Sequence, residues 1–478
     1  MEEIIVLLLG ITYGLIIGII PVVGATTGLV ALYPFIGYFS HNPYLGVVFC
    51  VAVVAASTTG DTFSGILLGI PGANSAAATM VDGFPLALKG KAAYALSAAF
   101  TVSTSNGLLW GSLTFLLLPL YAKIILKFGI PELFAFALLA FASVGFVSSK
   151  YWFRSLIAII IGILIGLVGI DVNASPRWTF GWDYLLDGVQ LIPVVVGLFA
   201  VPELLDGLRK RMKTTAIKAK DFKNQTFEGI KAGYKHWRFS LLGGFIGSII
   251  GILPGLGGAI ADWLAYGQTV AMNPSETFGN GNIKGVIGCE GANNAQKASS
   301  FIPTVLFGIP GAPFAAVLIS LFMYLNIEMG SIELANDTRF FNYLSFSFLV
   351  ATFLTGIICI FLCRFIAKIS VVPYKHYFPV LMALVIWASM QYTGGWEDFV
   401  ILLIMCIIGI AAKQLKFSRP SLLIGFILAE RIEKLSLQTF KLYNLSDLFR
   451  RPIFMVLIIF ITLIIVTGLK NRNRLEYN

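Results

Sequence analysis

The chain has 478 residues, of which 57% are hydrophobic and only 12% are charged, and its formal net charge is +10. A soluble globular protein carries about 25% charged residues, so this composition argues against a soluble enzyme. The high hydrophobicity also argues against a disordered chain. Long unbroken apolar runs favour an all-α polytopic integral membrane protein over an outer-membrane barrel, whose strands would alternate weakly.

A helix needs about 20 residues to cross the hydrocarbon core of a bilayer. Clear apolar runs lie, in chain order, at 4–20, 44–58, 94–118, 131–148, 153–170, 189–208, 239–254, 300–327, 340–367, 377–391, 396–412 and 451–469. Further short or interrupted apolar stretches lie at 25–39, 61–80, 256–271 and 420–430. We therefore expect roughly a dozen transmembrane segments, including broken or re-entrant helices. The acidic start, Met1-Glu2-Glu3, predicts a retained first helix rather than a signal peptide.

Basic residues gather in the stretch 209–238, which contains ten Lys or Arg and only two acidic residues. The positive-inside rule places such a stretch in the cytoplasm. We therefore predict a first membrane repeat half at 1–208, a basic cytoplasmic linker at 209–238 and a second membrane repeat half at 239–478. Nucleic-acid binding is not expected, because no soluble stretch is long enough to form a basic face.

Two motifs occur once in each half and in the same order. Residues 16–24 (IIGIIPVVG) match residues 249–257 (IIGILPGLG) at six of nine positions, and 68–73 (LGIPGA) match 307–312 (FGIPGA) at five of six. The first motif follows a lysine-free N-terminus in one half and the basic stretch in the other, so its two copies enter the membrane from opposite sides. We predict two internal repeats of inverted topology, as in secondary transporters.

Each half contains two Pro-Gly breaks inside apolar segments. Pro removes a backbone donor and Gly admits non-helical dihedrals, so the freed groups need partners in protein or in a water-filled cavity. Four breaks placed alike favour a binding site over ordinary kinks or close helix packing. Helices that restart after a break present free N–H groups, which suit an anion such as a carboxylate. The predicted substrate-binding residues are Gly24, Ala25, Thr26, Pro71, Gly72, Ala73, Asn74, Ser75, Gly255, Gly257, Pro310 and Gly311.

Local signals around the breaks give further expectations. Pro313 suits a first helical position. Residues 81–85 (VDGFP) predict a turn at a membrane surface, with Asp82 as a turn or cap residue. Side chains suited to N-caps follow two of the breaks, and they are Thr26, Thr27, Asn74 and Ser75.

Acidic residues lie close to three of the breaks. A carboxylate at membrane depth is costly and usually faces a functional cavity, although a solvated interfacial loop is the alternative. Carboxylate, amide and carbonyl oxygens suit a hard cation, so we predict a coupling ion, Na⁺ or H⁺, with Na⁺ bound at Asp61 or at Glu290 with Asn293 and Asn294. Lys297 could instead neutralise Glu290. The predicted cation-coupling residues are Asp61, Thr58, Thr59, Glu290, Asn293, Asn294 and Asp262.

Motifs for common enzyme chemistry are missing from the sequence. It contains no HExxH, no P-loop GxxxxGK[ST] and no GxSxG. We therefore expect neither an enzyme nor a bound cofactor, and an ATP-driven mechanism would need another subunit.

A series of stretches runs in order along nearly the whole chain, at 21–35, 65–72, 78–85, 169–181, 192–203, 251–257, 278–281, 290–295, 302–311 and 422–425. In these stretches the chain resembles the large membrane (permease) subunit of the tripartite tricarboxylate transporters. Two departures fall at the expected site, where this chain has Ala73-Asn74-Ser75 and Thr59-Gly60-Asp61.

The resemblance implies a permease subunit in the bacterial cytoplasmic (inner) membrane, working with a periplasmic substrate-binding protein and a small membrane subunit. It implies uptake of citrate-like tricarboxylates or dicarboxylates, by symport driven by a cation gradient rather than by ATP. The two departures mean that the substrate could differ from citrate.

Two other functions stay open at this point. A stand-alone secondary transporter or channel for another small solute would need no binding protein. An intramembrane enzyme acting on lipid or peptide, with Asp61 and Glu290 as a catalytic pair, is less favoured, because paired repeats with broken helices are typical of transporters.

Overall fold

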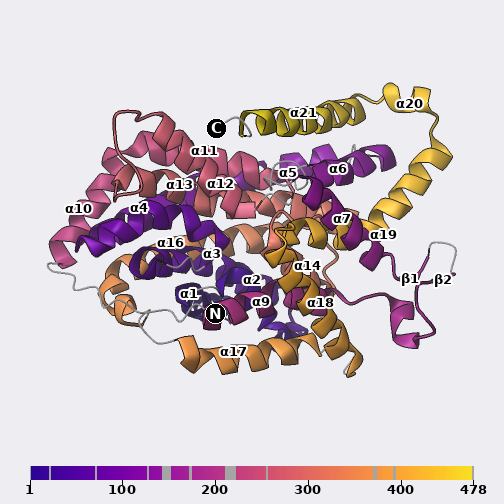
Figure 1. Cartoon of the computed structure of the whole chain (residues 1–478), viewed down its shortest axis with the longest axis horizontal. Coiled ribbons are helices and arrows are strands. Elements are labelled where there is room, and N and C mark those ends of the chain that lie inside the picture. Colours follow the sequence, from indigo (N-terminus) through magenta and orange to yellow (C-terminus); the bar gives the residue numbers. More distant parts are fainter. Residues whose placement is uncertain are drawn as a thin grey trace.

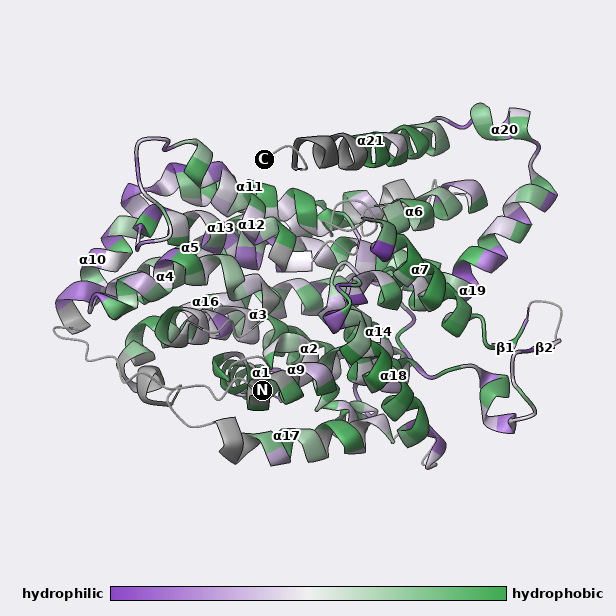
Figure 2. Ribbon diagram, viewed as in Figure 1, coloured by the Kyte–Doolittle hydropathy of each residue, from purple (hydrophilic) through white to green (hydrophobic). Residues whose placement is uncertain are grey.

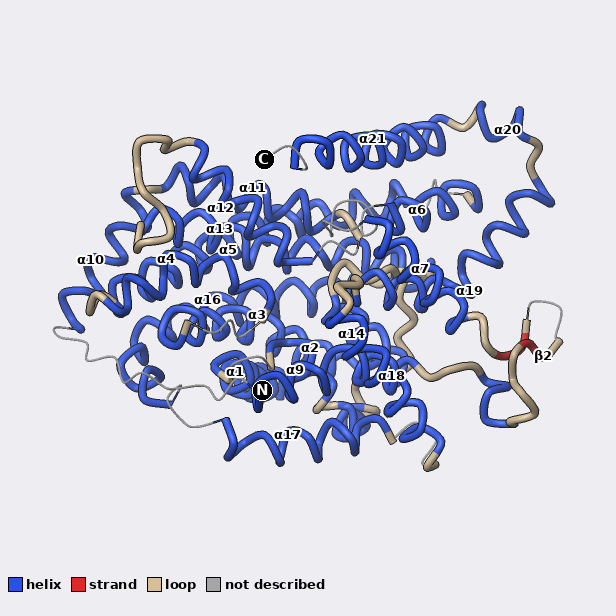
Figure 3. The backbone as a smooth tube through the Cα atoms, in the orientation of Figure 1, coloured by secondary structure: helices blue, strands red, loops and turns tan. Residues whose placement is uncertain are grey.

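A computed structural model of the chain describes residues 2–20, 23–69, 73–125, 129–142, 152–171, 175–209, 222–254, 257–369, 374–390 and 395–475. In these ranges the chain is almost entirely helical, and Figure 3 shows its strands as one short pair at the edge of the molecule. The predicted all-α class is confirmed for the described residues.

The first part of the chain folds into long helices separated by short helical pieces. In chain order they are α1 (Glu2–Ile19), α2 (Gly24–Val30), the 3₁₀ helix η1 (Tyr33–Phe39), α3 (Pro43–Leu68), the 3₁₀ helix η2 (Asn74–Ala76), α4 (Ala77–Leu88), α5 (Ala92–Ile125), α6 (Ile130–Ala142), α7 (Trp152–Gly166), β1 (Gly169–Ile170), β2 (Pro176–Arg177), the 3₁₀ helix η4 (Asp183–Asp187), α8 (Leu191–Val195), the π-helix η5 (Val196–Ala200) and α9 (Val201–Arg209). The expected interruption in 25–39 falls between α2 and η1. The one in 61–80 falls between α3 and α4.

The remaining helices begin within the predicted linker, of which residues 210–221 lie outside the described residues. They are α10 (Phe222–Lys235), α11 (Trp237–Ile252), α12 (Gly257–Ala271), α13 (Ile283–Phe301), the π-helix η6 (Ile302–Leu306), α14 (Pro313–Tyr324), α15 (Ile332–Ala335), α16 (Thr338–Ile369), α17 (Tyr374–Ser389), α18 (Glu397–Gln414), α19 (Arg419–Leu442), α20 (Leu445–Phe449) and α21 (Pro452–Leu475). The basic helix α10 packs against α5 rather than standing apart from the helical body.

Helices from the two parts of the chain pack in the same pattern and are interlocked (Figure 1). α1 lies along α3, and α11 lies along α13. The long helix α5 packs against α13, whereas the long helix α16 packs against α3. In addition, α2 contacts α14 and α12 contacts α4. The helix α5 of the first part therefore covers α13 of the second part, and α16 of the second part covers α3 of the first.

Glycines at every fourth position allow α1 and α11 to approach their neighbours closely. A Cβ atom added at Gly14 would lie 2.7 Å from the carbonyl oxygen of Val53 on α3, and one at Gly247 would lie closer still to the carbonyl oxygen of Ala292 on α13. Small residues at this spacing are typical of close helix pairs in membranes. The other glycines of the two stripes are Gly10, Gly18, Gly243 and Gly251.

A second group of helices, α6, α7, α19 and α21, packs beside this interlocked core. The two strands extend from it at the right of Figure 1 as an antiparallel pair in which Gly169 lies opposite Arg177. Arg177 donates to Glu433 on α19 through Nη1 over 2.6 Å and through Nη2 over 3.0 Å. These hydrogen bonds to Glu433 raise the pKa of Arg177 and tie the strands to α19.

Apolar helices occur along the whole chain, as the colouring of α1, α7 and α21 in Figure 2 illustrates. Among the described residues, three helical stretches are long and apolar enough to cross a membrane by length and composition, and these are Glu2–Ile19, Pro43–Leu67 and Thr338–Phe361. Shorter apolar helices of 10–17 residues follow through to the C-terminal part. This distribution indicates a multi-pass membrane protein.

The expected surface turn at residues 81–85 is wrong. The helix α4 continues through these residues with Pro85 inside it, and the side chain of Asp82 is 1% exposed. The sequence signals for a turn are overridden because α4 packs against α3, α5 and α13 along its length.

Candidate functional site

The helix α13 is buried along its length although it carries many polar side chains. Every residue from Gly285 to Phe301 is buried in the described structure. Its residues Glu290, Asn293, Asn294 and Lys297 recur at the three- and four-residue spacing that places side chains on one helical face. A buried ionisable face in a membrane protein is costly and points to a functional site.

Glu290 is held by hydroxyl groups from two elements of the first half. Its Oε1 atom accepts hydrogen bonds from Thr62 on α3 over 3.1 Å and from Thr79 on α4 over 2.6 Å. Its Oε2 atom is buried and has no hydrogen-bond partner in the described part of the chain. The carboxylate is therefore fixed through one oxygen while the other is left available.

Asp61 on α3 and Asp262 on α12 bring further buried carboxylate oxygens to this region. Asp61 Oδ2 accepts a hydrogen bond from Ser75 over 3.1 Å, whereas Asp61 Oδ1 and both oxygens of Asp262 lack a partner among the described residues. The charges of Asp61, Asp262 and Glu290 interact electrostatically with one another. These three carboxylates therefore lie in one buried region, although no three acidic groups of the described residues are close enough to hold one metal ion together. The alternative that they are solvated interfacial residues is wrong for these buried side chains.

The predicted amide and hydroxyl groups lie between α3 and α13. Asn293 Nδ2 donates to the carbonyl oxygen of Thr58 over 3.4 Å, and Asn294 Nδ2 donates to Thr59 Oγ1 over 3.2 Å. The Oδ1 atoms of both asparagines are buried without a partner in the described ranges. These oxygens belong to the class of ligands that Na⁺ and other hard cations take in proteins.

Lys297 does not pair with Glu290, the role that the sequence left open for it. Its electrostatic partners are Asp61 and Asp262, not Glu290. Its ammonium lies 5.4 Å from the ring centroid of Phe314, in the first turn of α14. No ion pair joins Lys297 to Glu290 among the described residues, so the alternative that Lys297 neutralises Glu290 is wrong. The helix α12 packs against α13, and Phe314 of α14 lies beside the ammonium.

The ionisable residues do not occupy equivalent positions in the two motifs. Counted back from the second Pro-Gly break of each half, Asp61 corresponds to Ser300 and Lys297 corresponds to Thr58. The Pro-Gly motifs are therefore shared by the two halves, whereas each charged residue of the site occurs in only one half.

The described parts of the predicted breaks lie close to one another. A Cβ atom at Gly258 would lie 3.1 Å from Ser75 Cβ, and one at Gly257 would lie 3.8 Å from Pro313 Cδ. Gly24 and Gly257 both have positive φ, +59° and +70°, which a residue with a side chain rarely adopts. Ala25 and Thr26 follow Gly24 on α2, which packs against α14. The predicted residues Pro71, Gly72 and Gly255 lie outside the described residues.

The fourth break offers apolar rather than polar surroundings. Pro310 lines a small pocket with Ala312, Pro313 and residues of α19, and all of the lining residues are apolar. The N–H group of the neighbouring Gly311 donates to Thr304 Oγ1 over 3.2 Å, so it already has a partner. Of the predicted substrate-binding positions, those near Ser75 and Gly257 therefore have the polar neighbours that a carboxylate needs.

The predicted first helical position at Pro313 is confirmed, whereas the predicted N-cap residues are wrong. Pro313 is the first residue of α14, as predicted. The N-cap of α2 is Val23, however, and Ala73 and Ala76 precede η2 and α4. Ser75 is not an N-cap, since it lies inside η2, and its hydroxyl donates to Asp61. The backbone of Asn74 lies in η2, directly after Ala73.

Asp82, which the sequence suggested only as a turn residue, joins α4 to the loop between α12 and α13. Its Oδ1 atom accepts hydrogen bonds from the backbone N–H groups of Gly279, Gly281 and Asn282 over 2.8–2.9 Å. Tyr266 on α12 donates to Oδ2 over 3.0 Å. No local sequence signal links Asp82 to a loop in the other half of the chain.

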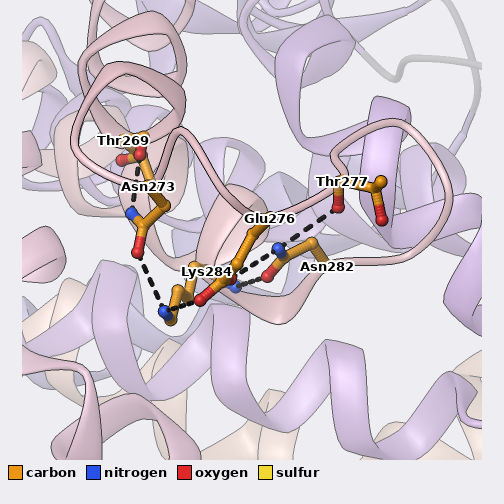
Figure 4. A network of polar contacts seen from close by, with 6 residues as sticks. All are labelled: Thr269, Asn273, Glu276, Thr277, Asn282 and Lys284. Atoms are coloured by element: carbon orange, nitrogen blue, oxygen red, sulfur yellow. Dashed lines mark hydrogen bonds and ion pairs between the residues drawn. The ribbon is translucent and has the colours of Figure 1, made fainter.

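A network of polar contacts also holds the same loop (Figure 4). Lys284 Nζ donates to Glu276 and, over 2.9 Å, to Asn273 Oδ1, while Asn282 Nδ2 donates to Glu276 Oε2 over 3.0 Å. These hydrogen bonds from Lys284 and Asn282 hold the pKa of Glu276 below its ordinary value. The loop that precedes α13 is thus held both by Asp82 and by this network.

Comparison with known proteins gives a consistent family assignment. Residues 4–424 match the model of the family described as "Tripartite tricarboxylate transporter TctA family". A protein of Agrobacterium vitis, named "Uncharacterized 52.8 kDa protein in TAR-I ttuC' 3'region", is 28% identical over 437 residues, which cover 89% of this chain and 84% of that protein. Another from the same organism, named "Uncharacterized protein in TAR-II ttuC' 3'region", is 31% identical over 193 residues, which cover 39% of this chain and 78% of that protein. No solved structure matches the chain.

Proposed function

The chain belongs to the tripartite tricarboxylate transporter TctA family, and from this membership we propose that it carries citrate-like tricarboxylates or dicarboxylates across the bacterial inner membrane by symport with a cation. It is a multi-pass membrane permease of a transporter family. The observation that supports the proposal most is the buried acidic cluster of Asp61, Asp262 and Glu290, in which four carboxylate oxygens have no hydrogen-bond partner among the described residues.

Cation coupling follows from the charges of this cluster. Three buried acidic residues stand against one buried lysine, so a carboxylate substrate that enters the same region adds to an existing excess of negative charge. Burying further negative charge in a low-dielectric interior is unfavourable unless cations or protons enter with it. Asp61, Glu290, Asn293 and Asn294 carry the unpartnered oxygens that would hold such a cation.

The halves 1–208 and 239–478, joined by the basic linker at 209–238, are the units of an inverted repeat in this proposal. The matched packing of α1 on α3 and of α11 on α13, each through a glycine stripe, supports that arrangement. The remaining expectation, roughly a dozen spans with some broken at the Pro-Gly motifs, belongs to the same proposal.

Two protein partners are part of the proposal. A periplasmic substrate-binding protein delivers the organic acid, and a small membrane subunit completes the transporter. Both follow from the tripartite type of the family. Delivery by a binding protein explains how a permease works at low substrate concentration without ATP, since the cation gradient supplies the free energy.

The experiment that tests this function is uptake into proteoliposomes. The vesicles contain the chain with its small subunit, an imposed Na⁺ or proton gradient, and labelled citrate or a panel of di- and tricarboxylates outside. Uptake that requires both the gradient and the binding protein supports the proposal. Uptake that is indifferent to the binding protein instead favours a stand-alone secondary transporter, and an absence of carboxylate uptake by folded protein contradicts the substrate class.

A further inference from the structure

Three side chains, two from α13 and one from η2, converge on one point in the first turn of α12. A Cβ atom added at Gly258 would lie 2.9 Å from Lys297 Nζ, 3.2 Å from Gln296 Oε1 and 3.1 Å from Ser75 Cβ. Gly258 is the second residue of this 15-residue helix. Because Gly258 has no side chain, an ammonium group, an amide group and a helix N-terminus lie close together at this point.

The position of Lys297 is electrostatically unusual. Its side chain is 7% exposed and forms no hydrogen bond or ion pair with any residue that the structure describes, and its contact with the Phe314 ring lies over the first turn of α14. The N-termini of α12 and α14 are adjacent, because Pro313 Cδ is 3.8 Å from the Cβ position of Gly257. Helix N-termini carry partial positive charge, so an ammonium between two of them is repelled by both.

Asp61 and Asp262 do not remove the repulsion between the Lys297 ammonium and the two helix N-termini. They interact with Lys297 electrostatically, but neither forms a direct ion pair with it in the described ranges. An anion beside Gly258 would contact the ammonium and the N–H groups of the first turn of α12 together.

Gln296 provides a second and independent observation. Its side chain is fully buried, and neither Nε2 nor Oε1 has a hydrogen-bond partner among the described residues. A buried amide without partners costs free energy, so such a group is expected to bind something that enters the site. Nε2 can donate to a carboxylate, and Oε1 can accept from a substrate hydroxyl or a protonated carboxyl group.

We propose that Lys297, Gln296 and the N-terminal turn of α12 at Gly258 form a subsite for one carboxylate group of the substrate. The inference rests on the proposed function and assigns residues that the motif analysis did not select. It also separates two tasks, since the subsite receives the anionic group while the free oxygens of Asp61, Asp262 and Glu290 face the coupling cation.

Gly258 offers a sharp test of the subsite. A methyl group there meets the far end of the flexible Lys297 side chain, which can move aside, so Gly258→Ala is expected to fold while it occupies the subsite. Gly267→Ala is the matched control, because Gly267 lies on the same helix and its added methyl group meets nothing within 4 Å. Lys297→Gln removes the ammonium, and Lys297→Arg retains the charge.

The experiment measures binding of labelled citrate, succinate and neutral trimethyl citrate to the purified full chain in detergent, with thermal unfolding as a check of folding. We expect citrate to bind about tenfold to about a hundredfold more weakly to Gly258→Ala and Lys297→Gln, with a smaller loss for Lys297→Arg and none for Gly267→Ala. Wild-type affinity for citrate in the folded Gly258→Ala and Lys297→Gln variants overturns the subsite alone. Failure of the wild-type chain to bind either carboxylate overturns the proposed substrate class, and the subsite with it.

Discussion

The hydroxyl of Thr79 donates to Glu290 Oε1 over 2.6 Å, so a residue of α4 fixes an acidic residue of α13 that follows it by more than two hundred positions. This hydrogen bond joins the two parts of the chain at the buried cluster. It also orients Glu290, because Thr62 donates to the same oxygen and Oε2 is left without a partner in the described structure.

Removing the Thr79 hydroxyl should therefore destabilise the cluster. We expect Thr79→Val to lower the free energy of unfolding by about 1–3 kcal/mol, because Glu290 Oε1 then keeps one donor in place of two. Thr62→Val should have a smaller effect, since its hydrogen bond is longer, at 3.1 Å. Denaturation in detergent measures both. The control is Thr12→Val, whose exposed hydroxyl donates only to Leu8 within α1, and equal losses for Thr79→Val and Thr12→Val would contradict this account.

Close packing of α1 on α3 depends on the glycine stripe. Gly14→Ala places a methyl group 2.7 Å from a backbone oxygen of Val53, which cannot move without separating the helices. We expect a loss of stability of about 1–3 kcal/mol. Gly247→Ala should behave in the same way on α11, whereas Gly267→Ala should be neutral or stabilise by up to about 1 kcal/mol through helix propensity. Thermal unfolding of the three variants separates these outcomes, and a stable Gly14→Ala variant would show that the helices are not in close contact.

Asp82 should be the main attachment of the loop that precedes α13. Asp82→Ala removes the acceptor of three backbone N–H groups and of Tyr266, and we expect faster hydrogen exchange at residues 279–282. Tyr266→Phe removes one of these hydrogen bonds and should cost only about 0.5–1.5 kcal/mol. Unchanged exchange in Asp82→Ala would mean that the network around Lys284 holds the loop by itself.

The contribution of Glu276 to stability should be constant near neutral pH. Its pKa is lower in the folded chain than its ordinary value of 4.5, because Lys284 and Asn282 donate to it. A lowered folded pKa means that the stabilisation is present above the unfolded pKa and is lost as pH falls through the folded pKa. The difference in melting temperature between wild type and Glu276→Gln should therefore be equal at pH values of about 7 and about 8, and a difference that changes over this interval would contradict the assignment.

The sequence singles out polar residues that are costly in apolar segments, but it does not show which residues they contact. Pro-Gly breaks and the acidic residues Asp61 and Glu290 stand out in apolar segments because each is costly there, so their positions could be predicted without coordinates. Their meeting depends on α3 packing beside α13, which no local pattern encodes.

Residues whose roles arise from long-range packing were misread or missed. The sequence leaves open that Lys297 neutralises Glu290, but in the structure its ammonium lies beside Gly258 and interacts electrostatically with Asp61 and Asp262. Asp82 carries the local signature of a turn, yet its acceptor capacity is used by a loop of the other half. In each case the side chain is positioned by an element that is distant in sequence.

The central claim is that the buried acidic cluster couples carboxylate movement to cation entry. The most direct measurement follows labelled citrate and cation entry together, with ²²Na⁺ or an internal pH indicator, in vesicles containing the complete transporter. We predict that citrate triggers cation entry in the wild-type protein and that Glu290→Gln abolishes this coupled entry, whereas Glu333→Gln at the exposed helix α15 does not. Citrate uptake without cation entry in the wild-type protein, or normal coupling in Glu290→Gln, would contradict the account.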